Sequence, residues 1–233
     1  NGDHVGGFTG VLRSIGYAIR QTQPTRVVVV FDGRDGSNSR KKIYGDYKAG
    51  RDKNKLRVNR QYADMMNEED ERESMKRQYM WLMEMMHELP ITTMIYDGVE
   101  ADDVMGTIAK KYSTKDLEVM LVTGDKDAYQ LVDDNVKIYA NKKGISEYEI
   151  YDANAIKEKL GLSPDQIIDY MALMGDSSDN IPGVKGIGEK SAQKLINNPA
   201  TINNPNQQVV VDGPIAEMTM AESEHDFGTI TEG

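Results

Sequence analysis

The sequence predicts an α/β fold in which helices cover a parallel sheet, and three observations predict it. Short β-branched and apolar runs alternate with longer segments of helical periodicity, the pattern of parallel strands joined by crossover helices. The 233 residues, 39% of them hydrophobic, suffice for one such domain with a small appendage. No apolar run reaches the roughly 18 residues that a membrane span needs, so we expect no membrane partner.

The first half of the chain supplies most of these elements. Apolar residues recur every three or four positions after Phe8, which indicates a helix, and the run from Val27 to Phe31 is typical of a strand buried on both faces. Pro90 ends a long Met-rich helix, whose apolar face we expect to pack in the core. The expected elements are helices over 8–20, up to Pro90 and over 103–112, and strands over 27–31, 92–96, 119–123 and 136–140.

After Asn141 we expect only helices. Asp152 is a candidate N-cap for a helix that runs to Gly161. Ser163 and Gln166 match a capping box, with proline at the first helical position of a helix that runs to about Met174. A Gly-rich hairpin and a helix over 189–196 follow. The last 35 residues carry six acids and no Lys or Arg, so we expect a disordered acidic tail over 199–233.

Composition excludes several kinds of chemistry. The chain has no cysteine and three scattered histidines, which excludes disulfides, a Cys nucleophile and thiolate metal sites, and disfavours a His-built zinc site. No signal peptide is recognisable, so we expect a cytoplasmic protein. The chain begins with Asn1 rather than Met, and we therefore expect a fragment.

Charge is distributed unevenly along the chain. The formal net charge is −10, yet residues 33–60 contain ten basic and three acidic residues. A basic island inside an acidic protein is a candidate contact for a polyanion such as nucleic acid. A solvated loop that happens to be basic explains the same pattern equally well.

Acidic residues follow the expected strands at the point where each strand ends. In an open parallel sheet the carboxyl ends of the strands meet at one edge, so we expect these side chains to converge. Converging carboxylates repel one another unless cations lie among them, and an all-oxygen ligand set selects Mg²⁺ or Mn²⁺. Two ions about 3.5–4 Å apart suit so many acids. The acids, including two in a later turn, are Asp32, Glu100, Asp102, Asp103, Asp125, Asp127, Asp176 and Asp179.

A simpler interpretation exists for single members of this group. Acids after strands are common helix N-caps, and Asp102 or Asp103 could cap the helix that follows. Three strand ends that carry acids together are harder to explain by capping, so we favour the metal site.

Around these acids the sequence resembles the 5′-nuclease family, which includes flap endonucleases, phage 5′–3′ exonucleases and the N-terminal nuclease domain of bacterial DNA polymerase I. The matching segments are GVEADDV at 98–104, TGDKD at 123–127 and ALMGDSSDNIPG at 172–183. The segment VKGIGEK at 184–190 is similar to the family's helix-hairpin-helix, and YKAGR at 47–51 to the basic segment at the base of its helical arch. The resemblance covers residues 8–196.

The resemblance implies a PIN-like (resolvase-like) fold. Residues 1–141 would form the catalytic domain, with the basic loop and helical arch over 33–78. Residues 142–198 would form the helix-hairpin-helix (H3TH) DNA-binding subdomain, and 199–233 the tail. Family members place a further metal-binding Asp on a strand before the first helix, and we expect that strand to lie ahead of Asn1.

The resemblance also implies roles for individual residues. Asp32, Glu100 and Asp102 would hold a first Mg²⁺ or Mn²⁺, and a second ion would lie among Asp102, Asp125, Asp127 and Asp179. Asp103 and Asp176 would act through bound water, and Lys48 and Arg51 would neutralise the scissile phosphate. A K⁺ ion is a further expectation at the hairpin. The DNA-binding residues would be Arg40, Lys41, Lys42, Gly183, Lys185, Gly186, Gly188 and Lys190.

We therefore expect a structure-specific 5′–3′ DNA exonuclease or flap endonuclease that uses two metal ions in DNA replication or repair. Its partners would be DNA with a 5′ flap, a nick or a 5′ duplex end, and a fused or separate DNA polymerase; we expect a monomer. Two alternatives stay open. One is a DNA-binding fragment without turnover, because a ligand strand lies outside the chain. The other is a PIN-like ribonuclease, because that group also uses acid clusters.

Overall fold

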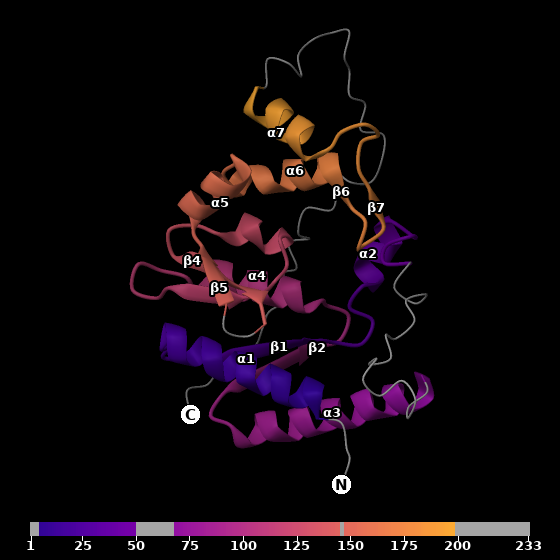
Figure 1. The fold of residues 1–233 in the computed structure, drawn as a ribbon, viewed down its shortest axis with the longest axis vertical. Helices are drawn as coiled ribbons and strands as arrows, with labels where there is room; N and C mark the ends of the chain where they lie inside the picture. Colours follow the sequence, from indigo (N-terminus) through magenta and orange to yellow (C-terminus); the bar gives the residue numbers. More distant parts are fainter. Residues whose placement is uncertain (1–4, 50–67, 145–146, 199–233) are drawn as a thin grey trace.

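The computed structural model describes residues 5–49, 68–144 and 147–198. Figure 1 shows two β-containing layers, with three C-terminal helices stacked on the second. The first layer contains α1 (Gly6–Thr22), β1 (Val28–Asp32), α3 (Glu68–Glu88) and β2 (Thr92–Tyr96), and α2 (Asn38–Ile43) lies higher in the view of Figure 1. The rest contains α4 (Ala101–Tyr112), β3 (Val119–Val122), η3 (Asp127–Leu131), β4 (Val136–Lys143), β5 (Glu147–Tyr151), α5 (Ala153–Leu160), η4 (Pro164–Gln166), α6 (Ile167–Met174), β6 (Gly175–Asp176), β7 (Ile181–Pro182) and α7 (Glu189–Asn197). Within the described ranges, no helix combines the length and apolarity needed to cross a membrane.

Helices α1 and α3 hold each other in place. Val5, the residue before α1, makes no side-chain cap, so the first N–H groups of α1 need another acceptor. Gln78 of α3 supplies it: its side-chain oxygen accepts the N–H groups of Gly7 at 2.8 Å and Phe8 at 3.1 Å. The ring of Phe8 also packs edge-on against Trp81. The C-terminal half of α3 is thereby fixed to the first layer.

The Met-rich helix α3 contributes only part of its apolar surface to the core. Leu82 and Met86 are buried, as expected for a core-facing stripe. Met75 and Met80 are more than half exposed. The predicted core role therefore holds for Met86 and not for these two methionines.

The parallel strands form two hydrogen-bonded sheets among the described residues, where the sequence predicted one. β1 pairs in parallel with β2, and β3 pairs in parallel with β4. The two sheets are connected by α4, which packs against both β1 and β3 and buries Val104 and Ala109. The carboxyl ends of β1 and β3 consequently both lie beside the start of α4.

Strand β5 corrects the expectation that only helices follow Asn141. It pairs antiparallel with β4, with Ile138 opposite Tyr151, and extends the second sheet. The segment EYEIY is too short for its alternation to stand out between a turn and a helix cap. The strand forms because it pairs with β4 at the edge of the sheet, and its own sequence does not predict that pairing.

The predicted caps of the C-terminal helices are confirmed. Asp152 accepts the N–H of Ala155 at 2.8 Å and begins α5, which ends at Gly161 in a left-handed conformation (φ 68°). The side chain of Gln166 accepts the N–H of Ser163 at 3.0 Å, completing the capping box before α6.

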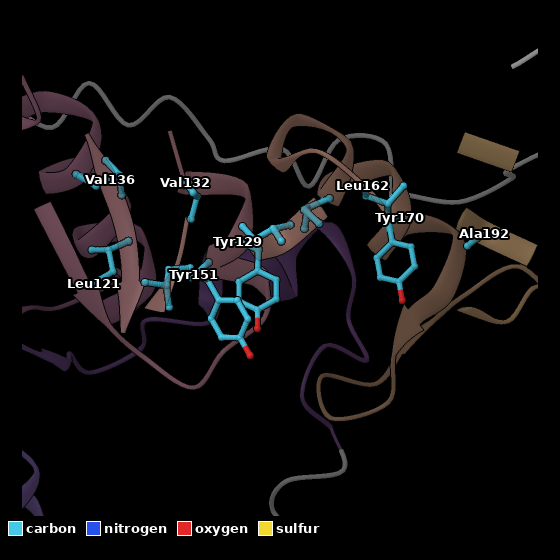
Figure 2. Packing of buried hydrophobic residues seen from close by; sticks show 13 residues of the cluster. Leu121, Tyr129, Val132, Val136, Tyr151, Leu162, Tyr170 and Ala192 are labelled. Carbon is cyan, nitrogen blue, oxygen red and sulfur yellow. The ribbon is translucent and has the colours of Figure 1, made fainter. Parts of the chain in front are cut away.

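One hydrophobic core connects the second sheet to the C-terminal helices. Figure 2 shows it running from Leu121 in the sheet through Tyr129 of η3 to Tyr170 of α6 and Ala192 of α7. Interiors packed this closely transmit displacement rather than absorb it. The core therefore fixes η3, which carries Asp127, relative to α6 and α7.

A two-residue pairing closes the loop that carries the last acids. β6 pairs with β7, and Gly175 adopts φ 71° at the base of the loop. A Cβ on Gly183 would lie 2.2 Å from the carbonyl carbon of Met174, so only glycine fits there. Residues 176–182 thus form a closed loop on a rigid base.

Candidate active site

The acids predicted from the sequence influence one another electrostatically. Burial raises the pKa of Asp102, and the charges of Asp125, Asp32 and Glu100 raise it further. Burial also raises the pKa of Asp127 to about 6, with additional contributions from Asp125, Asp176, Asp179 and Asp102. Acids from the ends of β1 and β3, from α4 and from the 176–182 loop therefore meet at one edge, which we call the acidic edge.

Hydrogen bonds from backbone N–H groups orient three of these carboxylates. Asp32 accepts the N–H of Ala101 at 2.8 Å, so it caps α4 across the gap between chain segments. Asp125 accepts the N–H of Asp127 at 3.0 Å at the start of η3, and Asp176 accepts the N–H of Ser178 at 2.7 Å. The capping interpretation thus applies to Asp32, whereas Asp102 and Asp103 lie inside the first turn of α4.

Glu100 is the buried anchor of the acidic edge. Only 7% of its surface is exposed, and a buried carboxylate must be paired. The Lys48 Nζ lies 2.6 Å from one of its oxygens, and the Arg40 guanidinium lies 2.9 Å from the other. The hydroxyl of Tyr47 also donates to it at 3.1 Å. These contacts bring the residues after α2 directly onto the acidic edge.

Arg40 turns toward the acids. Its guanidinium makes two hydrogen bonds to Asp103, at 2.7 and 2.6 Å. Burial alone would lower the pKa of Arg40, but the Asp103 bonds and the charges of Asp103 and Glu100 raise it above its ordinary value. Lys41 and Lys42, its neighbours on α2, are exposed. The DNA-binding role predicted for Arg40 stays a prediction, and in this structure the partners of Arg40 are carboxylates.

The acidic edge suits a divalent cation chemically. Its donors are carboxylate oxygens, which select hard ions, and burial together with the surrounding negative charge raises the pKa of Asp102 and Asp127, a charge that a cation would neutralise. Among the described residues, however, no three acidic or histidine side chains group closely enough to hold one ion together. Like charges separate, and Arg40 and Lys48 already lie between them.

A cavity of about 580 Å³ opens beside the second group of acids. Its lining includes Asp125, Asp127 and Asp176, together with Tyr170 of α6 and Glu189 of α7. The cavity therefore connects the acidic edge to the C-terminal helices that the sequence predicts to bind DNA.

The predicted hairpin lies between β7 and α7. Gly186 adopts φ 84°, the N–H of Ile187 bonds to the carbonyl of Val184 at 3.0 Å, and Gly188 is the N-cap residue of α7. Lys185 and Lys190 are exposed. Gly183 has the packing role described above, in addition to its predicted role in DNA binding. Arg51 and the part of the predicted arch over 50–67 lie outside the described residues, as does the predicted disordered tail.

Sequence reasoning missed two residues of the site. Tyr47 is 3% exposed and holds Glu100, and Asn180 bonds to the carbonyl of Asp46 at 2.8 Å. Neither lies in a periodic element. The only available signal was their position inside two motifs already recognised, YKAGR and SDNIPG.

We expect Arg40→Ala to destabilise the protein in the absence of metal by about 2–3 kcal/mol, a fall in Tm of roughly 5–10 °C, because Glu100 and Asp103 lose a cation that burial makes necessary. Lys41→Ala, an exposed neighbour on α2, is the matched control and should change the free energy of unfolding by less than about 0.5 kcal/mol. Thermal unfolding in EDTA measures both. Equal small changes would contradict a stabilising role for the Arg40 pairs.

Solved structures share this fold. The 5′-exonuclease of bacteriophage T5, described with bound zinc ions, superposes with a TM-score of 0.62 at 24% identity over 82% of this chain and 66% of that one. The catalytic core of Rad2, described in complex with a DNA substrate, superposes with a TM-score of 0.51 at 24% identity over 81% of this chain and 52% of that one. At this level of identity the similarity establishes the architecture.

Sequence relatives are closer. The chain is 34% identical to DNA polymerase I of Lactococcus lactis subsp. cremoris over 99% of its own length, which is 25% of that protein. It is 36% identical to DNA polymerase I of Bacillus caldotenax over 85% of this chain and 20% of that one. The 5′-3′ exonuclease of Bacillus subtilis is 37% identical over 84% of this chain and 60% of that one. The chain thus spans a fifth to a quarter of these polymerases.

Family models match most of the chain. Residues 1–161 match the 5′-3′ exonuclease N-terminal resolvase-like domain, and residues 162–224 match the 5′-3′ exonuclease C-terminal SAM fold. The second match continues past Asn197, so the family extends into the segment where the sequence alone showed no resemblance. With both models in chain order and the acidic edge formed from the motifs that carry the resemblance, the chain belongs to the 5′-3′ exonuclease family.

Proposed function

We propose that the protein is a structure-specific, metal-dependent 5′ nuclease that hydrolyses phosphodiester bonds of DNA. The observation that carries the proposal is the acidic edge, where burial and the charges of acids from four chain segments raise the pKa of Asp102 and Asp127, and where Lys48 is paired with Glu100. Family membership and the B. subtilis relative named a 5′-3′ exonuclease support it.

Two divalent ions, Mg²⁺ or Mn²⁺, are part of the proposal. Asp32, Glu100 and Asp102 would hold one, and the other would lie among Asp102, Asp125, Asp127 and Asp179, with Asp103 and Asp176 contributing through water. When bound, the ions would supply the positive charge that activates water and neutralises the phosphate. The T5 enzyme, described with bound zinc ions, supports divalent metal binding by a protein of this fold.

The protein's own groups would bind and orient the substrate. Lys48, 2.6 Å from Glu100 and 4.0 Å from Asp179, would place its ammonium beside the scissile phosphate. The hairpin would grip duplex DNA without reading its sequence, through backbone N–H groups before α7 and the charges of Lys185 and Lys190. A K⁺ ion at the hairpin remains part of this proposal, as does a phosphate contact by Arg51.

The substrates would be DNA with a 5′ flap, a nick or a 5′ duplex end, in replication or repair. Relatives named DNA polymerase I contain this region as a fifth to a quarter of their length, which supports a polymerase, fused or separate, as the partner. Rad2, whose catalytic core is described with DNA, supports DNA over RNA as the substrate.

A second candidate is DNA binding without turnover. It is favoured by the absence, among the described side chains, of three acids close enough to share an ion. In that case the hairpin would still bind duplex DNA, and the acidic edge would need a further ligand before it could work.

Cleavage of a 5′-labelled flap substrate distinguishes the candidates. We expect 5′ products in Mg²⁺ and none in EDTA, with flap DNA cleaved faster than RNA or an RNA–DNA hybrid assayed beside it. Binding of the flap without product in either Mg²⁺ or Mn²⁺ would favour the second candidate. Preferential cleavage of RNA would contradict the assignment to DNA and favour a ribonuclease.

A further inference from the structure

We infer that Asn180 is a positioning residue that holds Lys48 at the acidic edge, an inference that rests on the proposed nuclease function. Asn180 lies in the closed loop between β6 and β7, 134 positions from the carbonyl it contacts. No expected metal or DNA contact involves it. Its role follows from how two loops distant in the sequence are joined.

Two hydrogen bonds of the 46–48 backbone join the loops, one on each side of Tyr47, and the side chain of Tyr47 also bonds to Asp179. The side-chain amide of Asn180 donates to the carbonyl of Asp46 at 2.8 Å. The N–H of Lys48 donates to the carbonyl of Asp179, also at 2.8 Å. The turn that carries Lys48 is therefore held by its backbone from two adjacent residues of the opposite loop.

Both contacting residues adopt left-handed backbone conformations. Asn180 has φ 59°, which asparagine tolerates, and Lys48 has φ 57°, which a lysine adopts only at a cost. A conformation of this kind persists when surrounding contacts determine it, and such sites cluster where function needs a side chain in one place. Here the turn is closed by its own bond from the N–H of Ala49 to the carbonyl of Asp46 at 3.0 Å, and the two bonds from the 179–180 segment hold that turn against the opposite loop.

The backbone restraint directs the ammonium group. Lys48 Nζ lies 2.6 Å from Glu100 and 4.0 Å from Asp179, and only 17% of its side chain is exposed. Because a long lysine side chain has many rotamers, a fixed backbone is needed to keep its ammonium in one position. The closed loop provides a rigid support, since its base is pinned by Gly175 and Gly183.

Asn180→Gly isolates the amide, because glycine keeps the left-handed backbone without strain and removes only the hydrogen bond. We expect it to slow single-turnover cleavage of flap DNA about fivefold, the value of one hydrogen bond, and to change DNA affinity less than about twofold. Ser177→Ala, an exposed residue of the same loop, is the matched control and should leave the rate unchanged.

The double variant tests whether Asn180 acts through Lys48. In a Lys48→Ala background, Asn180→Gly should lower the rate less than about twofold, because the group it positions is gone. A full fivefold loss in that background would overturn the inference. If Asn180→Gly only loosened the loop, it would lower the rate about fivefold with or without Lys48. The smaller loss that we expect in the Lys48→Ala background therefore excludes a merely structural role.

Amide exchange of residues 44–49, followed by mass spectrometry on the full chain, provides a readout independent of activity. Asn180→Gly should accelerate exchange there, and Ser177→Ala should not. If the wild-type protein cleaves flap DNA but Asn180→Gly leaves amide exchange at residues 44–49 unchanged, the inference about Asn180 is overturned and the proposed function stands. A wild-type protein that cleaves no flap in Mg²⁺ or Mn²⁺ would overturn the proposed function, and the role of Asn180 in cleavage with it.

Discussion

Asp127→Asn is expected to abolish metal-dependent cleavage of flap DNA and, at neutral pH, to make the metal-free protein more stable. The two effects have opposite signs because the same negative charge serves metal binding and opposes folding. Asp127 is half-buried at the start of η3, where burial and then the charges of Asp125, Asp176, Asp179 and Asp102 raise its pKa to about 6. Asparagine keeps the shape of the side chain and removes the charge.

The pH dependence follows from the direction of this shift. The pKa of Asp127 in the folded protein lies above its ordinary value of 3.8, so the folded state binds its proton more tightly than the unfolded state does. This contribution to the free energy of unfolding is present below about pH 4 and is lost as the pH rises through about 6. Asparagine does not titrate, so its stabilising effect should be absent at pH 4 and present at pH 7.5.

We expect a rise in Tm of roughly 3 °C for Asp127→Asn at pH 7.5 in EDTA, and none at pH 4. Cleavage in Mg²⁺ should fall by a factor of at least about 1,000, since charge stabilisation at the phosphate is lost. Glu84→Gln, an exposed acid on α3, is the matched control and should change neither quantity. A fall in Tm at pH 7.5, or cleavage that survives, would contradict the place of Asp127 in the acidic edge.

Lys48→Ala should slow the chemical step roughly a hundredfold while changing DNA affinity only a few-fold, because one preorganised cation beside a reacting phosphate has about that effect on rate. Its ammonium is fixed among the carboxylates, where the low dielectric of a half-buried site strengthens its field. Glu100 keeps Arg40 and Tyr47 as partners in the variant, so the fold should persist.

Single-turnover cleavage and fluorescence anisotropy with the same flap separate the two roles of Lys48. Lys48→Arg is the informative companion: it keeps the charge but replaces a compact ammonium with a planar guanidinium, so we expect partial recovery of the rate. Losses of equal size in rate and affinity for Lys48→Ala would show that the lysine serves binding alone.

Local sequence signals predicted most elements of the fold. Helical periodicity located α1, short β-branched and apolar runs located β1 and β2, and cap chemistry at Asp152 and Ser163 located the C-terminal helices, because all three signals depend on neighbouring residues. Strand β5 was missed because its stability comes from pairing with β4, far less from its own five residues. The sequence also did not predict that the parallel strands divide into two sheets, because the division depends on which strands pair through hydrogen bonds in the folded protein.

The convergence of the acids was predictable from strand ends, whereas their partners were not. The rule that ligands gather at the carboxyl ends of parallel strands brought Asp32, Asp102 and Asp125 together, and their mutual effects on pKa agree with it. Nothing in the sequence indicated that Arg40 would pair with Asp103, or Asn180 with Asp46. Those contacts join residues 63 and 134 positions apart and exist only once the loops are folded.

Carboxylates from separate strand ends are proposed to hold divalent ions together, and anomalous diffraction from crystals grown in Mn²⁺ would locate those ions. We expect two peaks about 3.5–4 Å apart at the acidic edge, the second within bonding distance of Asp125 and Asp127. Manganese bound elsewhere on the protein, with no peak beside these side chains, would contradict this proposal.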